Sequence, residues 1–565
     1  EKVQGTVRVS HTQVSYMDDM PPVEDVSGTV HLTRDVVDID ITQGHTFDIR
    51  LTGGTISFYD LIQEISHAKI DLNMGGSLTD ALKILDHPPL GFTKDMGIIP
   101  EKVTGSVSGN LKLQLPVGDG FTGPEQIRIN ASAHISDAVL NDIVLDYGLR
   151  GVSMDLTVED QDVNGTGKGL FYTSPADFTI YQNFDSAQKL KTRINFNTVL
   201  DDDTRAHFDF GSGLLIPPSM SGPLNVSLLL TEQRDNSGNV DASFDLSGTD
   251  IYIRPIGWRK AAGVKGSGKV RLTLKNSELT GIPAFSFTDA QGTLIRGRAS
   301  FNRRNNALEK IELNPIRTGR TNAKARLRLS GGDSVKIDIT GASLDITGLL
   351  NNPDTMREST EDDETGEKTD STLTINAAVD RIWLSTAGYT RSNALYAFRQ
   401  GERWKRIDAV GRVGSQDIPL HFSFYPNPGK PDYSYVLTSG DAGGTLQAMD
   451  YINSIRGGRL EAQGTFMPGV GSKGSLFVSE FRMVEMPIFT RILMLTSFSG
   501  IVDMFKGEGL VFSSAEVPYR IDETSVTIKD AVVAGSSLGI TLNGKYYRDS
   551  GYLNFRGSLI PFYSI

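Results

Sequence analysis

Apolar and polar residues alternate along most of this chain. In the segment 37–58 the apolar positions are Val37, Ile39, Ile41, Phe47, Ile49, Leu51, Ile56 and Phe58. The pairs Gln43-Gly44 and Gly53-Gly54 interrupt the alternation, and we expect a turn at each. A period of two is typical of a strand with one apolar face and one wet face. The segment therefore predicts an antiparallel meander.

The same pattern recurs throughout the sequence, at 105–117, 222–233, 266–279, 322–346 and 525–547. Two of these stretches add the apolar positions Leu111, Leu113, Leu115, Val270, Leu272 and Leu274. Strands repeated over hundreds of residues favour a long sheet, stacked sandwiches or a solenoid. No strict repeat period is present, which argues against a propeller. The fold class is therefore mainly β.

Helical spacing is found in a few places. Ser77 is a suitable N-cap for a helix that carries Leu78, Leu82 and Leu85 on one face and ends at Pro88-Pro89. A second helix is predicted over 443–458, where Leu446, Met449 and Ile452 have helical spacing before Gly457-Gly458.

A third helix is predicted at about 486–505, and it is more apolar than the rest of the chain. Pro487 suits its first turn, and its apolar stripe contains Ile488, Phe489, Ile492, Leu495 and Phe498. The stripe is too short to span a bilayer, which needs about 20 apolar residues. Three roles fit it: a helix that plugs or lines an apolar groove near its end, a helix packed on the sheet as core, or an interfacial membrane helix.

The stretch 351–372 has almost no apolar residues and carries an acidic cluster at 361–364. Such a composition does not bury enough apolar surface to order itself, so we expect a disordered linker or loop. It divides the chain into regions 1–350 and 373–565.

Composition excludes several classes of protein. The chain has 565 residues, a net charge of −12 and no cysteine. The negative charge argues against nucleic acid as a partner, because phosphates require a basic stripe. The lack of cysteine excludes disulfides and thiol chemistry. No apolar run reaches the about 18 residues of a membrane span. Because the chain begins at Glu1, we expect a fragment or a processed chain, with any anchor outside it.

Motifs that would carry catalysis or cofactors are incomplete. The stretch 263–270 resembles a phosphate-binding loop, but Val270 stands where Ser or Thr is needed and a strand pattern follows. The eight histidines lack metal-ligand spacing, and no GxSxG elbow is present. A polysaccharide-acting enzyme is the enzymatic alternative, but the chain has only three tryptophans and no distinct carboxylate pair. We therefore expect no enzyme, no cofactor and no metal.

Several motifs in order resemble the long AsmA-like proteins, the group that contains YhdP and is related to TamB. The first is the stretch "SLTDALKILDHPPLGFTKDMGIIPEKVTGSVSGNLKLQLPV". Then come "DIYIRPIGWRKAAGVKGSGKV", with Trp258 and Lys260, and "ITGASLDITGLL". The stretches "SGDAGGTLQAMDYINSIRGGRLEAQGTF" and "GSLIPFYS" resemble the AsmA-like C-terminal domain.

This resemblance implies a fold and a function. Region 1–350 would be the YhdP-like central β-groove, and 373–565 the AsmA-like C-terminal β region. The fold would be an elongated, twisted antiparallel sheet curled into a trough. The family consists of bacterial bridge-like lipid-transfer proteins of the periplasm, anchored in the inner membrane. The implied partners are phospholipid acyl chains, the inner membrane through an anchor outside this sequence, and outer-membrane components.

The alternating pattern supports this expectation on physical grounds. An apolar sheet face exposed to water is costly, at about 25 cal/mol per Å². Either a second sheet or an acyl chain can cover it, and both alternatives fit the 14 apolar positions given above for 37–58, 111–115 and 270–274. Phospholipid transport between the inner and outer membranes is thus the leading function. A periplasmic scaffold that assembles outer-membrane proteins through strand-edge pairing is the alternative.

Overall fold

The computed structural model describes most of the chain: residues 4–16, 20–88, 91–118, 126–144, 147–207, 215–253, 258–302, 304, 307–330, 334–351, 371–401, 403–484, 509–536 and 538–561. The chain forms two compact units. Unit 1 contains Glu1–Ile251 and Ala261–Ile282, and unit 2 contains Tyr252–Lys260 and Pro283–Ile565. This division lies at a different place from the predicted boundary at 351–372, which stays a prediction.

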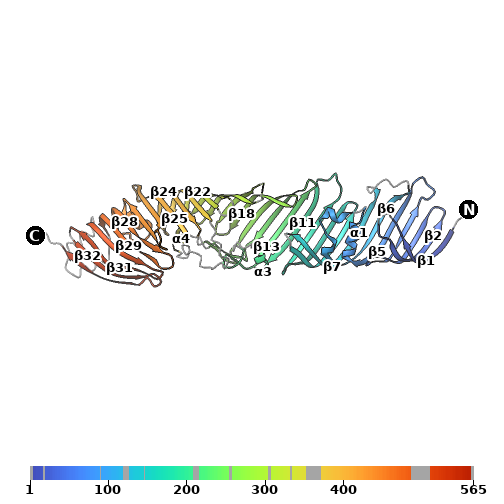
Figure 1. Ribbon diagram of the computed structural model, residues 1–565, viewed down its shortest axis with the longest axis horizontal. Coiled ribbons are helices and arrows are strands. Elements are labelled where there is room, and N and C mark those ends of the chain that lie inside the picture. Colours follow the sequence, from blue (N-terminus) through green and yellow to red (C-terminus); the bar gives the residue numbers. More distant parts are fainter. Residues whose placement is uncertain are drawn as a thin grey trace. The chain divides into compact units, whose positions relative to one another are not determined.

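The fold is mainly β, and thirty strands belong to one hydrogen-bonded sheet (Figure 1). The first strands are β1 (Gln4–Val14), β2 (Val23–Thr33), β3 (Val37–Thr46), β4 (Ile49–Tyr59), β5 (Ser66–Ser77), β6 (Val103–Val117), β7 (Arg128–Val144), β8 (Tyr147–Glu159), β9 (Asp162–Phe171), β10 (Ser174–Asn183), β11 (Leu190–Leu200), β13 (Leu224–Gln233), β14 (Ser237–Asp245) and β17 (Gly266–Lys275). Three short strands lie outside this sheet: β12 (Met220–Ser221), β15 (Asp250–Ile253) and β16 (Trp258–Lys260).

The later strands continue the same sheet. They are β18 (Glu278–Asp289), β19 (Leu294–Phe301), β20 (Leu308–Thr318), β21 (Thr321–Ser330), β22 (Ser334–Asp345), β23 (Thr372–Trp383), β24 (Tyr389–Gln400), β25 (Arg403–Val413), β26 (Ile418–Pro426), β27 (Tyr433–Ser439), β28 (Ile455–Met467), β29 (Gly471–Met483), β30 (Leu510–Ile521), β31 (Ser525–Gly535), β32 (Leu538–Tyr547) and β33 (Leu553–Pro561).

Within each unit a strand pairs with its neighbours in the chain, and almost every pairing is antiparallel. The exception is β22 with β23, which are parallel from Ser334↔Thr372 to Asp345↔Trp383. Among the described residues β1 pairs only with β2, and β33 only with β32, so the sheet is open. The predicted class, a mainly β chain on a long antiparallel sheet with a few short helices, is confirmed.

The helices of the described residues are few and short: α1 (Leu78–Asp86), α2 (Phe92–Met96), the 3₁₀ turn η1 (Pro100–Lys102), α3 (Asp202–His207), α4 (Thr347–Asn351) and α5 (Ala442–Ala448). The Ser77 cap of α1 is confirmed, because its hydroxyl accepts from the Asp80 N–H at 3.3 Å. The helix predicted over 443–458 is wrong in extent. Asp441 caps α5, which ends at Ala448, and the Gly457-Gly458 pair lies inside β28.

The two turns predicted inside 37–58 are also wrong. Strand β3 continues through Gln43-Gly44, and β4 continues through Gly53-Gly54. The turn is instead at Phe47, which has a φ of 52°. Glycine is needed at position 54 because a Cβ there would lie 2.3 Å from the carbonyl oxygen of Asp71 on the next strand. These glycines therefore permit close strand approach rather than reversal of the chain.

Each unit has its core where a helix packs over one end of the strands. In unit 1, Leu78 and Leu82 of α1 pack with buried residues of β6 to β10, among them Val103, Ala138 and Val152. Figure 1 shows α1 against these strands. In unit 2, Leu446 of α5 belongs to the cluster of β28 to β32, and this cluster includes Phe512. Among the described residues, the helices thus cover only part of the apolar face.

Candidate functional site

Seven aliphatic side chains form a continuous row across the first seven strands. Paired residues of neighbouring strands point to the same face of a sheet. The row, named here the β1–β7 row, follows the pairings Val7–Val30–Ile39–Ile56–Ile70–Leu113–Ile129. With strands about 4.8 Å apart, the six steps extend over about 29 Å.

A second row crosses the later strands of unit 1. Its pairings give Ile180–Ile194–Leu230–Val240–Leu272, from β10 through β11, β13 and β14 to β17, and it is named here the β10–β17 row. The pairing of Ile180 with Gly165, and of Gly165 with Leu156, carries it back to β8. One face of unit 1 therefore presents aliphatic groups across strand after strand.

Neither row is fully buried by protein. Val7 is 48 % exposed, and the other members of both rows are partly exposed. Strand β13 shows the gradient clearly: Leu224 and Val226 are buried, while Leu228 and Leu230 on the same face are partly exposed. At the start of the sheet this face is hollowed by a cavity of about 420 Å³, whose lining includes Val9, Val26, Val30, Ile39 and Ile41. The rows are thus an open apolar surface.

The opposite face of these strands is charged and wet. Arg271 donates to Asp241 across β14 and β17 at 2.6 Å, and Lys112 lies 3.6 Å from Asp71 across β5 and β6. Lys265 and Lys269 are exposed, and the strand β17 excludes a phosphate-binding helix terminus there. The sheet therefore separates water on one face from aliphatic groups on the other.

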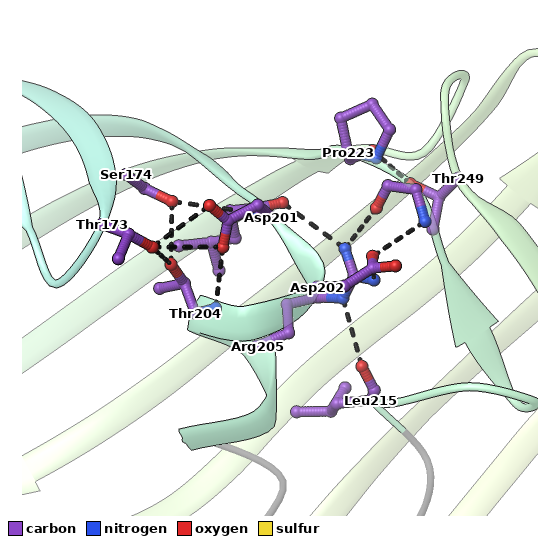
Figure 2. Close-up of polar contacts among 11 residues, drawn as sticks. Thr173, Ser174, Asp201, Asp202, Thr204, Arg205, Leu215, Pro223 and Thr249 are labelled. Carbon is purple, nitrogen blue, oxygen red and sulfur yellow. Dashed lines mark hydrogen bonds and ion pairs between the residues drawn. The ribbon is translucent and has the colours of Figure 1, made fainter.

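A buried arginine stabilises the strand ends of unit 1 that the helices cover (Figure 2). Arg205 lies on α3, directly after β11, and its side chain is 1 % exposed. Its guanidinium donates to the carbonyl oxygens of Leu215 (3.1 Å), Leu200 (3.4 Å) and Gly222, and it forms an ion pair with Asp202. These bonds tie the end of β11 to the segment that leads into β13.

The neighbouring Asp201 completes this structure. Its carboxylate accepts from the Thr204 N–H at 2.7 Å and from the Thr173 hydroxyl at 3.1 Å. Hydrogen bonds from Thr204 and Thr173 lower the pKa of the Asp201 carboxyl below its usual value. Every charged group of this cluster has a protein partner, so the cluster supports the fold and offers no free acid or base.

The predicted apolar positions are mostly brought together on the open face. Ile39, Ile56 and Leu113 belong to the β1–β7 row, and Leu272 belongs to the β10–β17 row. Beside the first row, pairings join Val37–Phe58–Ala68–Leu115 and Ile41–Gly54–Leu72–Leu111. Leu51 pairs with Met74, Val270 with Ala242 and Leu274 with Gly238. Contact of these residues with lipid stays a prediction.

Three predicted positions are placed differently from the others. Ile41 and Ile49 are buried, at 8 % and 6 % exposure, so protein already covers them. Phe47 is 52 % exposed, at the turn between β3 and β4 rather than within a row. The groove-end residues Ile488, Phe489, Ile492, Leu495 and Phe498 lie outside the described residues.

Sequence reasoning did not nominate the middle of the surface: Ile129, Ile180, Ile194, Leu230 and Val240. Their strands alternate in the same way, so the period-two signal was available. Alternation assigns each residue to a face of the sheet, but it does not give the register, so the partner of each residue on the next strand could not be predicted. Within the described residues, no helix is long and apolar enough to cross a membrane. No group of three or more His, Asp or Glu side chains is placed there to hold a metal ion.

Comparison with known proteins agrees with the resemblance read from the motifs. Among proteins with curated descriptions, none matches this chain. The family model described as "YhdP protein" matches residues 1–406, which is most of the 565 residues and continues past the acidic stretch 351–372. The chain therefore belongs to the YhdP family, a family of cell-envelope proteins that are generally not enzymes.

Proposed function

We propose that this protein carries phospholipids between the inner and outer membranes, with the acyl chains lying on the open apolar face of the sheet. The observation that supports this most is the continuity of the β1–β7 and β10–β17 rows. Full burial of one Val, Leu or Ile side chain is worth about 1.5–3 kcal/mol. An acyl chain that covers the exposed parts of several row members therefore gains several kcal/mol without any specific hydrogen bond.

The repetition of the rows suits transport better than storage. Each step from one strand to the next, about 4.8 Å, offers an acyl chain nearly the same aliphatic surface. Movement along a row then exchanges one aliphatic contact for an equivalent one. The headgroup remains in water at the strand ends that no described helix covers, where the strands carry polar residues such as Gln114 and Gln233.

The proposed location is the periplasm, with the chain held at the inner membrane by an anchor outside this sequence. This placement rests on the family, whose members belong to the cell envelope. No catalytic group, cofactor or metal takes part in the proposed function, because desolvation of acyl chains is its whole chemistry.

Photocrosslinking tests the proposal with a control next to it in the chain. A photoreactive amino acid at Leu113 lies on the apolar face, and one at Lys112 lies on the wet face of the same strand. We expect phospholipid adducts from position 113 and few from 112, and extracted phospholipid in mass spectra of the purified protein. If photoreactive residues at positions Leu113 and Ile194 both give adducts with protein alone, the proposal is wrong. Such a result would favour the alternative of a scaffold for outer-membrane proteins.

A further inference from the structure

Three hydroxyl groups interrupt the apolar face of unit 2. The Tyr435 hydroxyl on β27 lies 2.6 Å from the Tyr519 hydroxyl on β30 and 2.7 Å from the Ser472 hydroxyl on β29. Both distances are those of hydrogen bonds between hydroxyls. These three groups are named here the hydroxyl cluster.

The cluster lies at the end of an apolar row. In unit 2 the pairings give Leu327–Ile337–Ile375–Ala397–Ile407–Phe424–Tyr435, from β21 to β27, and this is named here the β21–β27 row. The next positions are Gly464 and Gly474, followed by Tyr519. The hydroxyls therefore lie on the same face as the row. Its members Leu327, Ile337, Ile375 and Ile407 are partly exposed, while Ala397 and Phe424 are buried.

Glycines on two strands make room for this arrangement. A Cβ on Gly464 would lie 2.4 Å from the Tyr435 hydroxyl oxygen, and one on Gly474 would lie 3.0 Å from it. The Tyr435 ring thus extends over β28, and its hydroxyl meets that of Tyr519 from the other side. Two glycines and two aromatic rings thus place polar atoms at the end of the apolar row.

The hydrogen bonds within the cluster leave one donor over. Three hydroxyls carry three O–H donors, and the two bonds between them use two. Burial and the neighbouring Tyr435 hydroxyl raise the pKa of Tyr519, so its phenol stays neutral at physiological pH. Whichever way the two bonds run, one of the three O–H groups remains for an outside acceptor.

We infer that the hydroxyl cluster donates this hydrogen bond to an ester carbonyl of a glycerophospholipid whose acyl chain lies on the β21–β27 row. This inference rests on the proposed function. A neutral carbonyl is the acceptor that fits, because a charged phosphate on an apolar face would carry a large desolvation cost. One leaflet is about half of the roughly 30 Å hydrocarbon core, so a single acyl chain covers about three strand spacings of the row. The cluster gives the lipid one fixed position on a surface that is otherwise uniform.

The test uses the full chain and phosphatidylethanolamine with a diazirine beside the ester carbonyl. We expect labelling of β27 to β30, reduced about threefold to tenfold in Y435F/Y519F, as the loss of one neutral hydrogen bond predicts. Both rings remain in that variant, and Ser472→Ala provides a second one. The control is Tyr425→Phe, which removes a hydroxyl from the opposite, exposed face of β26.

A lipid with ether linkages has no ester carbonyl, and we expect it to label β27 to β30 weakly in the wild-type protein. A diazirine at the end of the acyl chain should label the β21–β27 row equally in wild type and variants. Equal labelling by the diazirine beside the carbonyl in wild type and Y435F/Y519F would overturn this inference but not the proposed function. Water would then be the acceptor for the spare O–H. Lack of labelling by every probe anywhere on the chain would overturn the proposed function as well.

Discussion

Serine substitutions at two positions on β13 test whether protein or lipid covers the apolar face. Leu224 and Leu230 are the same residue type, on the same strand and the same face, but Leu224 is 5 % exposed while Leu230 is partly exposed. Leu224→Ser removes a buried side chain beside the edge held by Arg205. Leu230→Ser removes a member of the β10–β17 row.

The expected costs differ severalfold. Truncation of a buried leucine costs about 2–5 kcal/mol, and burial of the new hydroxyl adds about 1–3 kcal/mol, so Leu224→Ser should destabilise β13 by about 3 kcal/mol or more. At Leu230 water already reaches the side chain, and the serine hydroxyl remains hydrated. The cost there should be about 1 kcal/mol or less.

The assay is native-state hydrogen exchange of the β13 amides in the full chain, because a chain of two units has no single unfolding free energy. The same samples are extracted for phospholipid, and Leu230→Ser should reduce the lipid that crosslinks to Ile194. If both variants lose stability by the same 3 kcal/mol or more, protein covers the row along its whole length. That result would refute the open face and the lipid path with it.

Three further changes test other parts of the structure. Arg205→Met leaves the carbonyl oxygens of Leu200, Leu215 and Gly222 without the arginine donor, while the Asp202 carboxylate keeps the Gly222 N–H. The variant should lower the stability of unit 1 by about 3–5 kcal/mol, because each buried carbonyl group that loses its partner costs about 1–3 kcal/mol. Arg271→Met, at an exposed ion pair, is the control and should cost less than about 1 kcal/mol; equal thermal shifts for both variants would contradict a structural role for Arg205. Gly464→Ala places a Cβ 2.4 Å from both the Tyr435 hydroxyl and the Lys473 carbonyl oxygen, so the near-ultraviolet dichroism of the tyrosines should change, and an unchanged spectrum would argue against the ring position. Hydrogen bonds from Lys310 and Arg298 lower the pKa of Glu312 from 4.5 to about 2. The stabilising effect of the Glu312 carboxylate should therefore be complete above about pH 4.5 and disappear as the pH falls toward 2. Glu312→Gln should remove this part of the acid dependence of Tm, and identical profiles of Tm against pH for both proteins would show that these ion pairs do not contribute to stability.

Alternation along the chain predicted the faces of the strands well. Val37, Ile39, Ile56 and Phe58 were assigned to one face from their spacing, and the pairings Val37↔Phe58 and Ile39↔Ile56 place them there. The same signal could not give the direction of a strand, because a period of two is identical in parallel and antiparallel pairs. The parallel pairing of β22 with β23 was therefore not foreseen.

Glycines and covered edges were the other limits. The pattern predicts a turn at Gly53-Gly54, whereas in the structure Gly54 lets β4 approach the next strand closely. The sequence also could not distinguish Leu224 from Leu230, because the difference depends on which edge α1 and α3 cover. The aromatic bridge over Gly464 and Gly474 depends on residues separated by 84 positions in the chain, Tyr435 and Tyr519.

Because consecutive strands pair with each other, the length of the sheet can change most simply by whole hairpins. Removal of two adjacent strands joins residues of the same face and the same direction, and it shortens the sheet by about 10 Å. Removal of one strand would instead reverse every strand that follows and move the covering helices to the opposite edge. Relatives of different length should therefore differ mostly by even numbers of strands.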